Sequence, residues 1–156
     1  MTLSIGTLKE QELLEKSIKE FPLHLDKNKF IKPLVKQVFS ELENKGFSLF
    51  RPHIYLGDEW FSPEGEPCIS IPFYLAHSRL RKLQYKHTGE AEGSEKDEFL
   101  KLLRHEIGHT FDHVYKLSKT KQWRKVFGNP KVKYNPDNYN FNVQENCKSI
   151  IEKELT

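Results

Sequence analysis

The stretch LRHEIGH, residues 103–109, decides which fold this sequence is expected to adopt. It lies within residues 95–117, where apolar side chains recur every three or four positions, which predicts an amphipathic α-helix. On such a helix His105 and His109 share one face about 5–6 Å apart, so both imidazoles can bind one metal ion. The pattern H-E-x-x-H therefore predicts Zn²⁺ held by His105 and His109, with Glu106 as the general base that takes a proton from water.

A third protein ligand is not defined by this pattern. His113 lies four residues beyond His109, but a helix rises about 1.5 Å per residue, so His105 and His113 are expected about 12 Å apart. One zinc ion could bind both only if the helix broke between them, so we expect His113 to line the site instead. Carboxylates near the C-terminus are the other candidates. The choices left open are His113, Glu145, Glu152, with Glu154 as a further available carboxylate, or no third ligand.

The remaining sequence predicts an α+β fold with a helical N-terminal part. Two strands are expected, over residues 47–56 and 68–75, and Pro52 and Pro72 indicate edge positions because proline lacks the N–H that a ladder needs. Helices are expected from their periodicity and boundary residues over 8–21, 31–45, 78–87, 95–117 and 120–127.

Composition excludes several classes of protein. The chain has 156 residues, which suits one domain over residues 1–156. No apolar run approaches the roughly 20 residues of a membrane span, and no basic start followed by an apolar stretch indicates a signal peptide. Cys68 and Cys147 form neither a C-x-x-C metal motif nor a disulfide framework. We therefore expect a cytoplasmic protein with reduced thiols and no membrane partner.

The charge is distributed unevenly along the chain. The net charge is only +3, but an acidic loop over residues 88–98 precedes the expected metal-binding helix and a basic stretch over 113–136 follows it. Lysines interleaved with Trp123 and Phe127 are one pattern of a nucleic-acid surface. Solvated lysines at the C-terminal end of a helix explain the same residues more simply, and we expect that alternative.

Four separated segments carry a resemblance to known proteins. They read DEWFSP at residues 58–63, IPFYLAH at 71–77, LRHEIGH at 103–109 and WRKVFG at 123–128. Together they resemble a bacterial family of zinc-binding metallopeptidases, over about residues 35–140.

This resemblance implies a zincin-like fold, in which a small mixed sheet lies over the helix that carries H-E-x-x-H. It implies His105 and His109 as zinc ligands, Glu106 as the catalytic base and a peptide or protein as the substrate. Residues 68–76 resemble the cleft-edge strand of such folds, which could bind an extended peptide by main-chain pairing.

The sequence departs from the family after Tyr134. Family members continue into a helix with closely spaced glutamates, and the resemblance implies that this helix provides the third ligand. Residues 134–156 of this chain diverge from that pattern. Three outcomes remain open: Glu145 or Glu152 replaces that ligand, another chain supplies it, or the protein is a shortened and inactive relative. The alternative functions are therefore an inactive zinc-binding or interaction module and, less favoured, a nucleic-acid-binding regulator.

Other polar side chains could assist a hydrolytic site, although an ordinary surface or partly buried position is the simpler expectation for each. His53 and His77 could donate a hydrogen bond to an oxyanion, and Asp112 could orient an imidazole that binds the metal. The tyrosines considered for the same part are Tyr74, Tyr115 and Tyr139.

Overall fold

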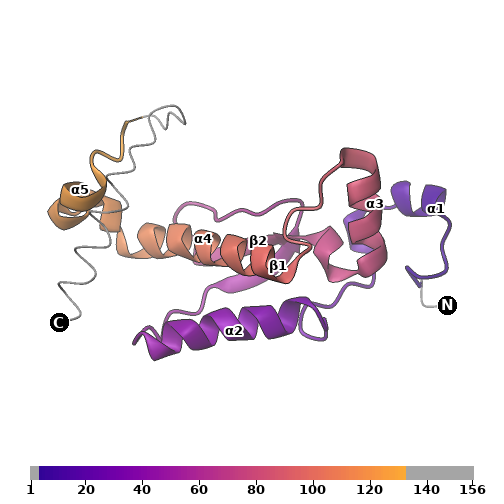
Figure 1. Ribbon diagram of the computed structural model, residues 1–156, viewed down its shortest axis with the longest axis horizontal. Helices are drawn as coiled ribbons and strands as arrows, with labels where there is room; N and C mark the ends of the chain where they lie inside the picture. The colour runs from indigo at the N-terminus through magenta and orange to yellow at the C-terminus, as the bar shows by residue number, and fades with distance from the viewer. Residues whose placement is uncertain (1–3, 133–156) are drawn as a thin grey trace. The chain divides into compact units, whose positions relative to one another are not determined.

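The computed structural model describes residues 4–132 and has a mixed α/β architecture, which confirms that helices are combined with a small sheet. In chain order the helices and strands are α1 (Glu10–Leu14), α2 (Ile31–Asn44), β1 (His53–Gly57), β2 (Cys68–Pro72), α3 (Ser78–Thr88), α4 (Lys96–Tyr115) and α5 (Lys121–Phe127), as Figure 1 shows. Short 3-10 helices occur at Ile18–Glu20, Phe73–Ala76 and Leu117–Lys119.

The chain divides into two compact units. The first ends at Thr110 and the second begins at Phe111, so the boundary falls inside α4. The sheet, α1 to α3 and the larger part of α4 belong to the first unit. His105 and His109 both lie in that unit.

The N-terminal segment departs from the single helix that residues 8–21 predict. Glu12 accepts a hydrogen bond from the Lys9 N–H and starts α1, and Glu20 accepts one of 2.8 Å from the Ser17 N–H and starts the following 3-10 helix. Each carboxylate satisfies an amide that a helix start leaves without a partner. The prediction of one continuous helix is wrong because the second cap, at Ser17, interrupts it.

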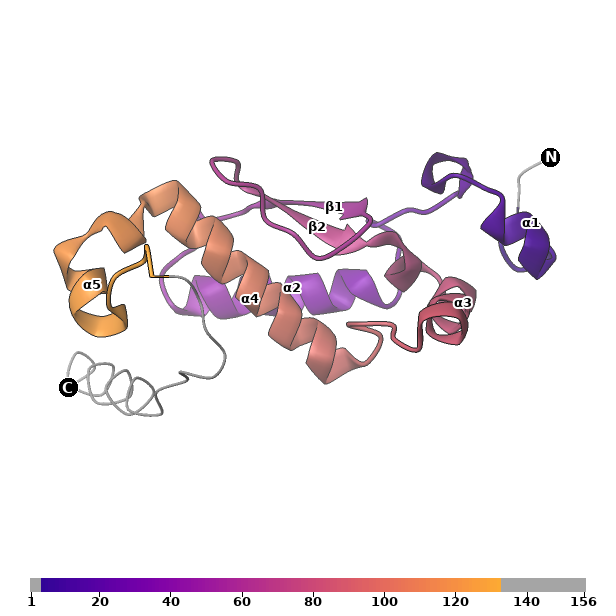
Figure 2. The ribbon, with the colours of Figure 1, turned by 90° about the horizontal axis from the view of Figure 1, so that it is seen from above.

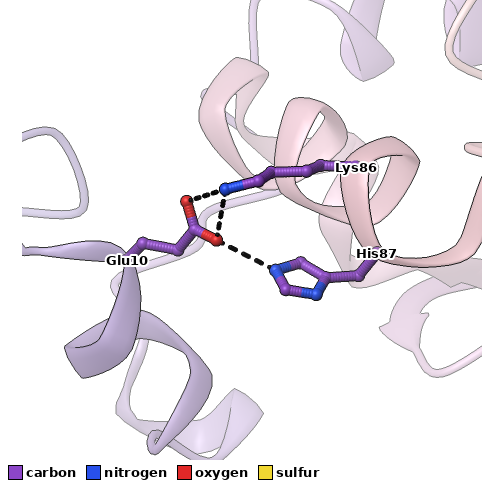
Figure 3. Close-up of polar contacts among 3 residues, drawn as sticks. All are labelled: Glu10, Lys86 and His87. Atoms are coloured by element: carbon purple, nitrogen blue, oxygen red, sulfur yellow. Dashed lines mark hydrogen bonds and ion pairs between the residues drawn. The ribbon is translucent and has the colours of Figure 1, made fainter.

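Polar contacts join this N-terminal segment to α3. The Glu10 carboxylate accepts hydrogen bonds from Lys86 Nζ at 2.8 and 2.9 Å and lies 3.0 Å from His87 Nε2, as Figure 3 shows. Arg79 Nη1 donates a bond of 2.7 Å to the main-chain oxygen of Ile5, which is buried. Residues far apart in sequence therefore hold α1 against α3.

α2 begins and ends close to the predicted limits of 31–45. The Asn28 Oδ1 accepts the N–H groups of Phe30 and Ile31 at 2.9 and 2.8 Å, and its Nδ2 donates to the Ala76 main-chain oxygen at 2.6 Å. The side chain that caps the helix thus also fixes it to the chain that leaves β2. Gly46, with φ of +86°, follows the C-terminal end.

The sheet is smaller than the sequence predicts. β1 and β2 pair in parallel, with His53 opposite Cys68 and Gly57 opposite Pro72. The predicted strand 47–56 forms only from His53, and the predicted strand 68–75 ends at Pro72, where the chain turns into a 3-10 helix. Pro72 lies opposite Gly57, the last residue of β1, so the ladder ends where the partner strand ends.

The outer edge of β2 is closed by its own chain. Phe61 and Ser70 form an antiparallel bridge, with the Ser70 N–H donating to the Phe61 oxygen at 2.8 Å. The Cys68 N–H, which faces the same side, donates to the Glu66 oxygen at 2.9 Å, and Pro72 has no N–H. The expectation that residues 68–76 offer a peptide an open edge is therefore not met along β2.

Aromatic side chains pack α4 against the rest of the first unit. Phe99 is fully buried and meets the rings of Phe30 and Trp60 edge to face, with centroids 5.6 and 5.1 Å apart. Arg104 and Glu41 join α4 to α2 by two parallel hydrogen bonds of 2.9 and 2.8 Å. Figure 2 shows the beginning of α4 on the same side of the β1–β2 pair as α2.

Candidate metal centre

α4 presents the two predicted ligands on its exposed face. The observed limits, Lys96–Tyr115, agree with the predicted 95–117 to within two residues. Positions 99, 103, 107 and 110 are buried, whereas His105 and His109 are exposed. This division follows from the helical period of 3.6 residues, because the apolar positions form one stripe and the histidines lie outside it.

The two imidazoles converge on one point. His105 Nε2 and His109 Nε2 are 2.9 Å apart, and the ring centroids are separated by 4.5 Å at an interplanar angle of 87°. Two nitrogens bound to one tetrahedral zinc ion at about 2.0–2.1 Å lie roughly 3.3 Å apart. A slight rotation of either ring reaches that separation, so the pair fits two ligands of a zinc ion.

Glu106 lies at the boundary between the exposed and buried faces of α4, and a buried side chain binds its carboxylate. Its side chain is only 8% exposed, and its Oε2 accepts a hydrogen bond of 2.7 Å from Ser62 Oγ. Thr110 Oγ1 lies 3.0 Å from the Glu106 main-chain oxygen and 3.2 Å from Ser62 Oγ. We call these three buried side chains the Ser62–Glu106–Thr110 cluster.

A third metal ligand is not found in the described part of the chain. Among residues 4–132, no group of three His, Cys, Asp or Glu side chains is arranged to hold a metal ion. α4 runs without a break through His109 and His113, so the break that His113 would need is not present. Glu145, Glu152 and Glu154 lie outside the described residues, and the C-terminal alternatives stay predictions.

The auxiliary candidates of the first unit have structural partners of their own. His77 caps α3, where its Nδ1 accepts the Arg79 N–H at 3.1 Å; burial lowers the His77 pKa, with Arg79 and Arg81 adding to the effect. Tyr74 donates from its hydroxyl to the Glu92 main-chain oxygen at 3.0 Å. His53 is exposed and stacks on Tyr55, with ring centroids 6.5 Å apart.

The second unit contains the other described candidates. Asp112 Oδ1 accepts a hydrogen bond of 2.6 Å from the Ser118 N–H, so it holds the turn that follows α4. The Tyr115 ring packs at a tilt on Phe111, 4.5 Å away. In α5 the Trp123 and Phe127 rings pack on each other at 5.0 Å. Tyr139 and Cys147 lie outside the described residues.

Ser62 and Thr110 are the residues of this centre that motif reasoning did not identify. Ser62 lies 44 positions before Glu106, and no local spacing connects them. Two signals could have pointed to them. Ser62 belongs to the DEWFSP segment that carried the family resemblance, and Thr110 is one helical turn after Glu106.

Comparison with known proteins adds no assignment, because no protein-family model, curated protein or solved structure matches this chain. Within residues 4–132, none of the helices combines the length and the apolar character needed to cross a bilayer.

Proposed function

We propose that this protein is a zinc-dependent peptide hydrolase with a zincin-like arrangement, related to the bacterial zinc-binding metallopeptidases that its motifs resemble. The single observation that supports this most strongly is the 2.9 Å approach of His105 Nε2 to His109 Nε2 on the exposed face of α4. Histidines held this close on a regular helix present two nitrogen ligands to one ion.

In this proposal each residue of the motif has a distinct part. His105 and His109 would hold the metal, which would supply a Lewis acid for the scissile carbonyl and for water. Glu106 accepts the proton of the attacking water and passes it to the leaving amine. The burial of Glu106 supports its role as general base, because packed neighbours hold a buried carboxylate in one orientation.

A second candidate function is a zinc-binding or interaction module without catalysis. The observation that favours it is that residues 4–132 supply only two convergent ligands, whereas catalytic zinc sites commonly have three. Both candidate functions require the histidine pair. They differ only in whether Glu106 acts as a general base on a substrate.

Metal analysis and hydrolysis assays separate the two. We expect the purified protein to bind about one equivalent of zinc, and His105→Ala and His109→Ala to lose it. Glu106→Gln should retain zinc and lose hydrolysis of a quenched fluorescent peptide library. His87→Ala, which removes an exposed histidine of α3, is the matched control and should alter neither property.

Wild-type protein that binds no zinc would contradict both candidates. Protein that binds zinc through this pair but hydrolyses no member of the library would exclude the hydrolase and support the module.

A further inference from the structure

A buried carboxylate is costly unless hydrogen bonds replace the water that it loses. Glu106 is 8% exposed, and Ser62 Oγ donates to its Oε2 at 2.7 Å, within the range of charge-assisted O–H···O bonds. The adjacent histidines lie on the exposed face. One oxygen of Glu106 is therefore bound by a buried side chain, whereas the two histidines on the same helix are exposed.

The main chain at Ser62 is itself rigidly supported. Its neighbour Phe61 forms two main-chain hydrogen bonds with Ser70, of 2.8 and 3.3 Å, and Ser70 belongs to the buried strand β2. On the other side of Phe61, the Trp60 ring packs edge to face on the fully buried Phe99. The Ser62 hydroxyl is thus positioned by a well-supported main chain, and precise sites require such support.

Thr110 supplies a second hydroxyl that contacts Ser62. Ser62 Oγ has two acceptors in reach, the Glu106 Oε2 at 2.7 Å and the Glu106 main-chain oxygen at 3.0 Å. Thr110 Oγ1 can donate either to that main-chain oxygen or to Ser62 Oγ itself. Of the two acceptors, the carboxylate is the stronger and lies at the shorter distance, so it is the preferred partner of the Ser62 proton.

From this cluster we infer that Ser62 is a positioning residue for Glu106, and this inference rests on the proposed hydrolase function. Ser62 occupies Oε2, so Oε1 is the oxygen that accepts the proton from water. Thr110 supports Ser62 from the next turn of α4. Neither hydroxyl touches the substrate, and both act by restricting the carboxylate to one orientation.

The test compares Ser62→Ala with the zinc-loaded wild type. We expect kcat to fall about 10-fold or more, the order of one hydrogen bond to a charged group, with KM and zinc stoichiometry unchanged. Ser62→Thr, which keeps the hydroxyl, should recover most of kcat. A crystal structure of Ser62→Ala provides a readout independent of activity, in which the Glu106 carboxylate should change or lose its defined orientation.

The matched control is Ser94→Ala. Ser94 Oγ is also buried, but within residues 4–132 it has no hydrogen-bond partner, so its removal should leave kcat unchanged. If Ser62→Ala does not fold, Thr110→Val takes its place. It is nearly isosteric and removes the hydroxyl that contacts Ser62 Oγ, and a kcat reduction of about threefold or more is expected.

Two results would overturn the inference in distinguishable ways. Hydrolysis that requires Glu106 but is unaffected by Ser62→Ala and Thr110→Val refutes the positioning part and leaves the hydrolase standing. A zinc-loaded wild type that hydrolyses no peptide of the library refutes both.

Discussion

Gly57 on β1 lies directly against Ser70 on β2. A Cβ atom placed on Gly57 would be 2.2 Å from Ser70 Oγ, closer than any two such atoms can approach. Ser70 is only 4% exposed, so its hydroxyl would have to move within a packed interior. Ser70 also bridges to Phe61, which precedes the residue that holds Glu106. This close approach therefore lies next to the support of the candidate centre.

Gly57→Ala should destabilise the fold by about 1–3 kcal/mol, the usual cost of inserting a methyl group into a packed interior. Adding Ser70→Ala should recover part of that loss, because the next contact of the new Cβ, with Ser70 Cβ, is an ordinary 3.4 Å. Chemical denaturation of both single variants and the double variant measures the coupling. Additive effects of the two substitutions would show that the two residues do not meet as described.

Gly108→Ala should have the opposite effect. Gly108 lies in the interior of α4, and a Cβ there would meet nothing within 4 Å. Alanine loses less backbone freedom on folding than glycine, so the free energy of unfolding should rise by about 0.5–1 kcal/mol. Thermal unfolding measures the gain and metal analysis checks that zinc is still bound. A lower Tm for Gly108→Ala would contradict the open space around position 108.

Low pH should weaken the contact between α1 and α3. Hydrogen bonds from Lys86, and then from His87, hold the pKa of Glu10 below its ordinary 4.5. Because the folded pKa is depressed, the contribution of Glu10 is complete above the unfolded value and is lost as pH falls through the folded pKa.

Protection factors of the α1 amides at pH 6 and pH 3, taken relative to the intrinsic exchange rate at each pH, measure this weakening. Glu10→Gln should show the same low protection at both values. Glu15→Gln is the control, because Glu15 accepts a side-chain bond only from its neighbour Gln11 among the described contacts. Equal protection of α1 in wild type and Glu10→Gln at pH 6 would rule out this role of Glu10.

High pH should reveal the burial of Tyr74. Burial, reinforced by Glu92 and Glu98, raises the pKa of Tyr74 from 10.0 to about 12. A raised folded pKa means that the stability contribution is complete below pH 10 and is lost as pH rises from 10 towards 12. Denaturation from pH 9 to 11.5 should therefore show a steeper loss in wild type than in Tyr74→Phe. Identical slopes would contradict the prediction.

Helices with clear boundary residues could be predicted from the sequence. α2 follows from its apolar stripe with Pro33 in the first turn and Gly46 after the end, and α4 follows from its uninterrupted stripe. The predicted N-terminal helix failed because capping interactions such as Ser17 with Glu20 compete with helix continuation, and apolar spacing alone does not weigh that competition.

Strands were harder to predict because their extent depends on partners. Residues 47–52 have strand-like composition, but the parallel pairing with β2 begins only at His53. The closure of the β2 edge by Phe61 could not be predicted, since it arises from a loop that folds back by nine positions rather than from any periodic pattern.

Sequence by itself determined that His105 and His109 meet, because an i, i+4 spacing on a regular helix brings two side chains together whatever the rest of the chain does. Only the tertiary structure decided how Glu106 is held. Its partner Ser62 is 44 positions away, and a contact at that separation exists only once β2 and α4 are packed in place. Local geometry is encoded in a few neighbouring residues, whereas the environment of a buried carboxylate is a property of the whole packed unit.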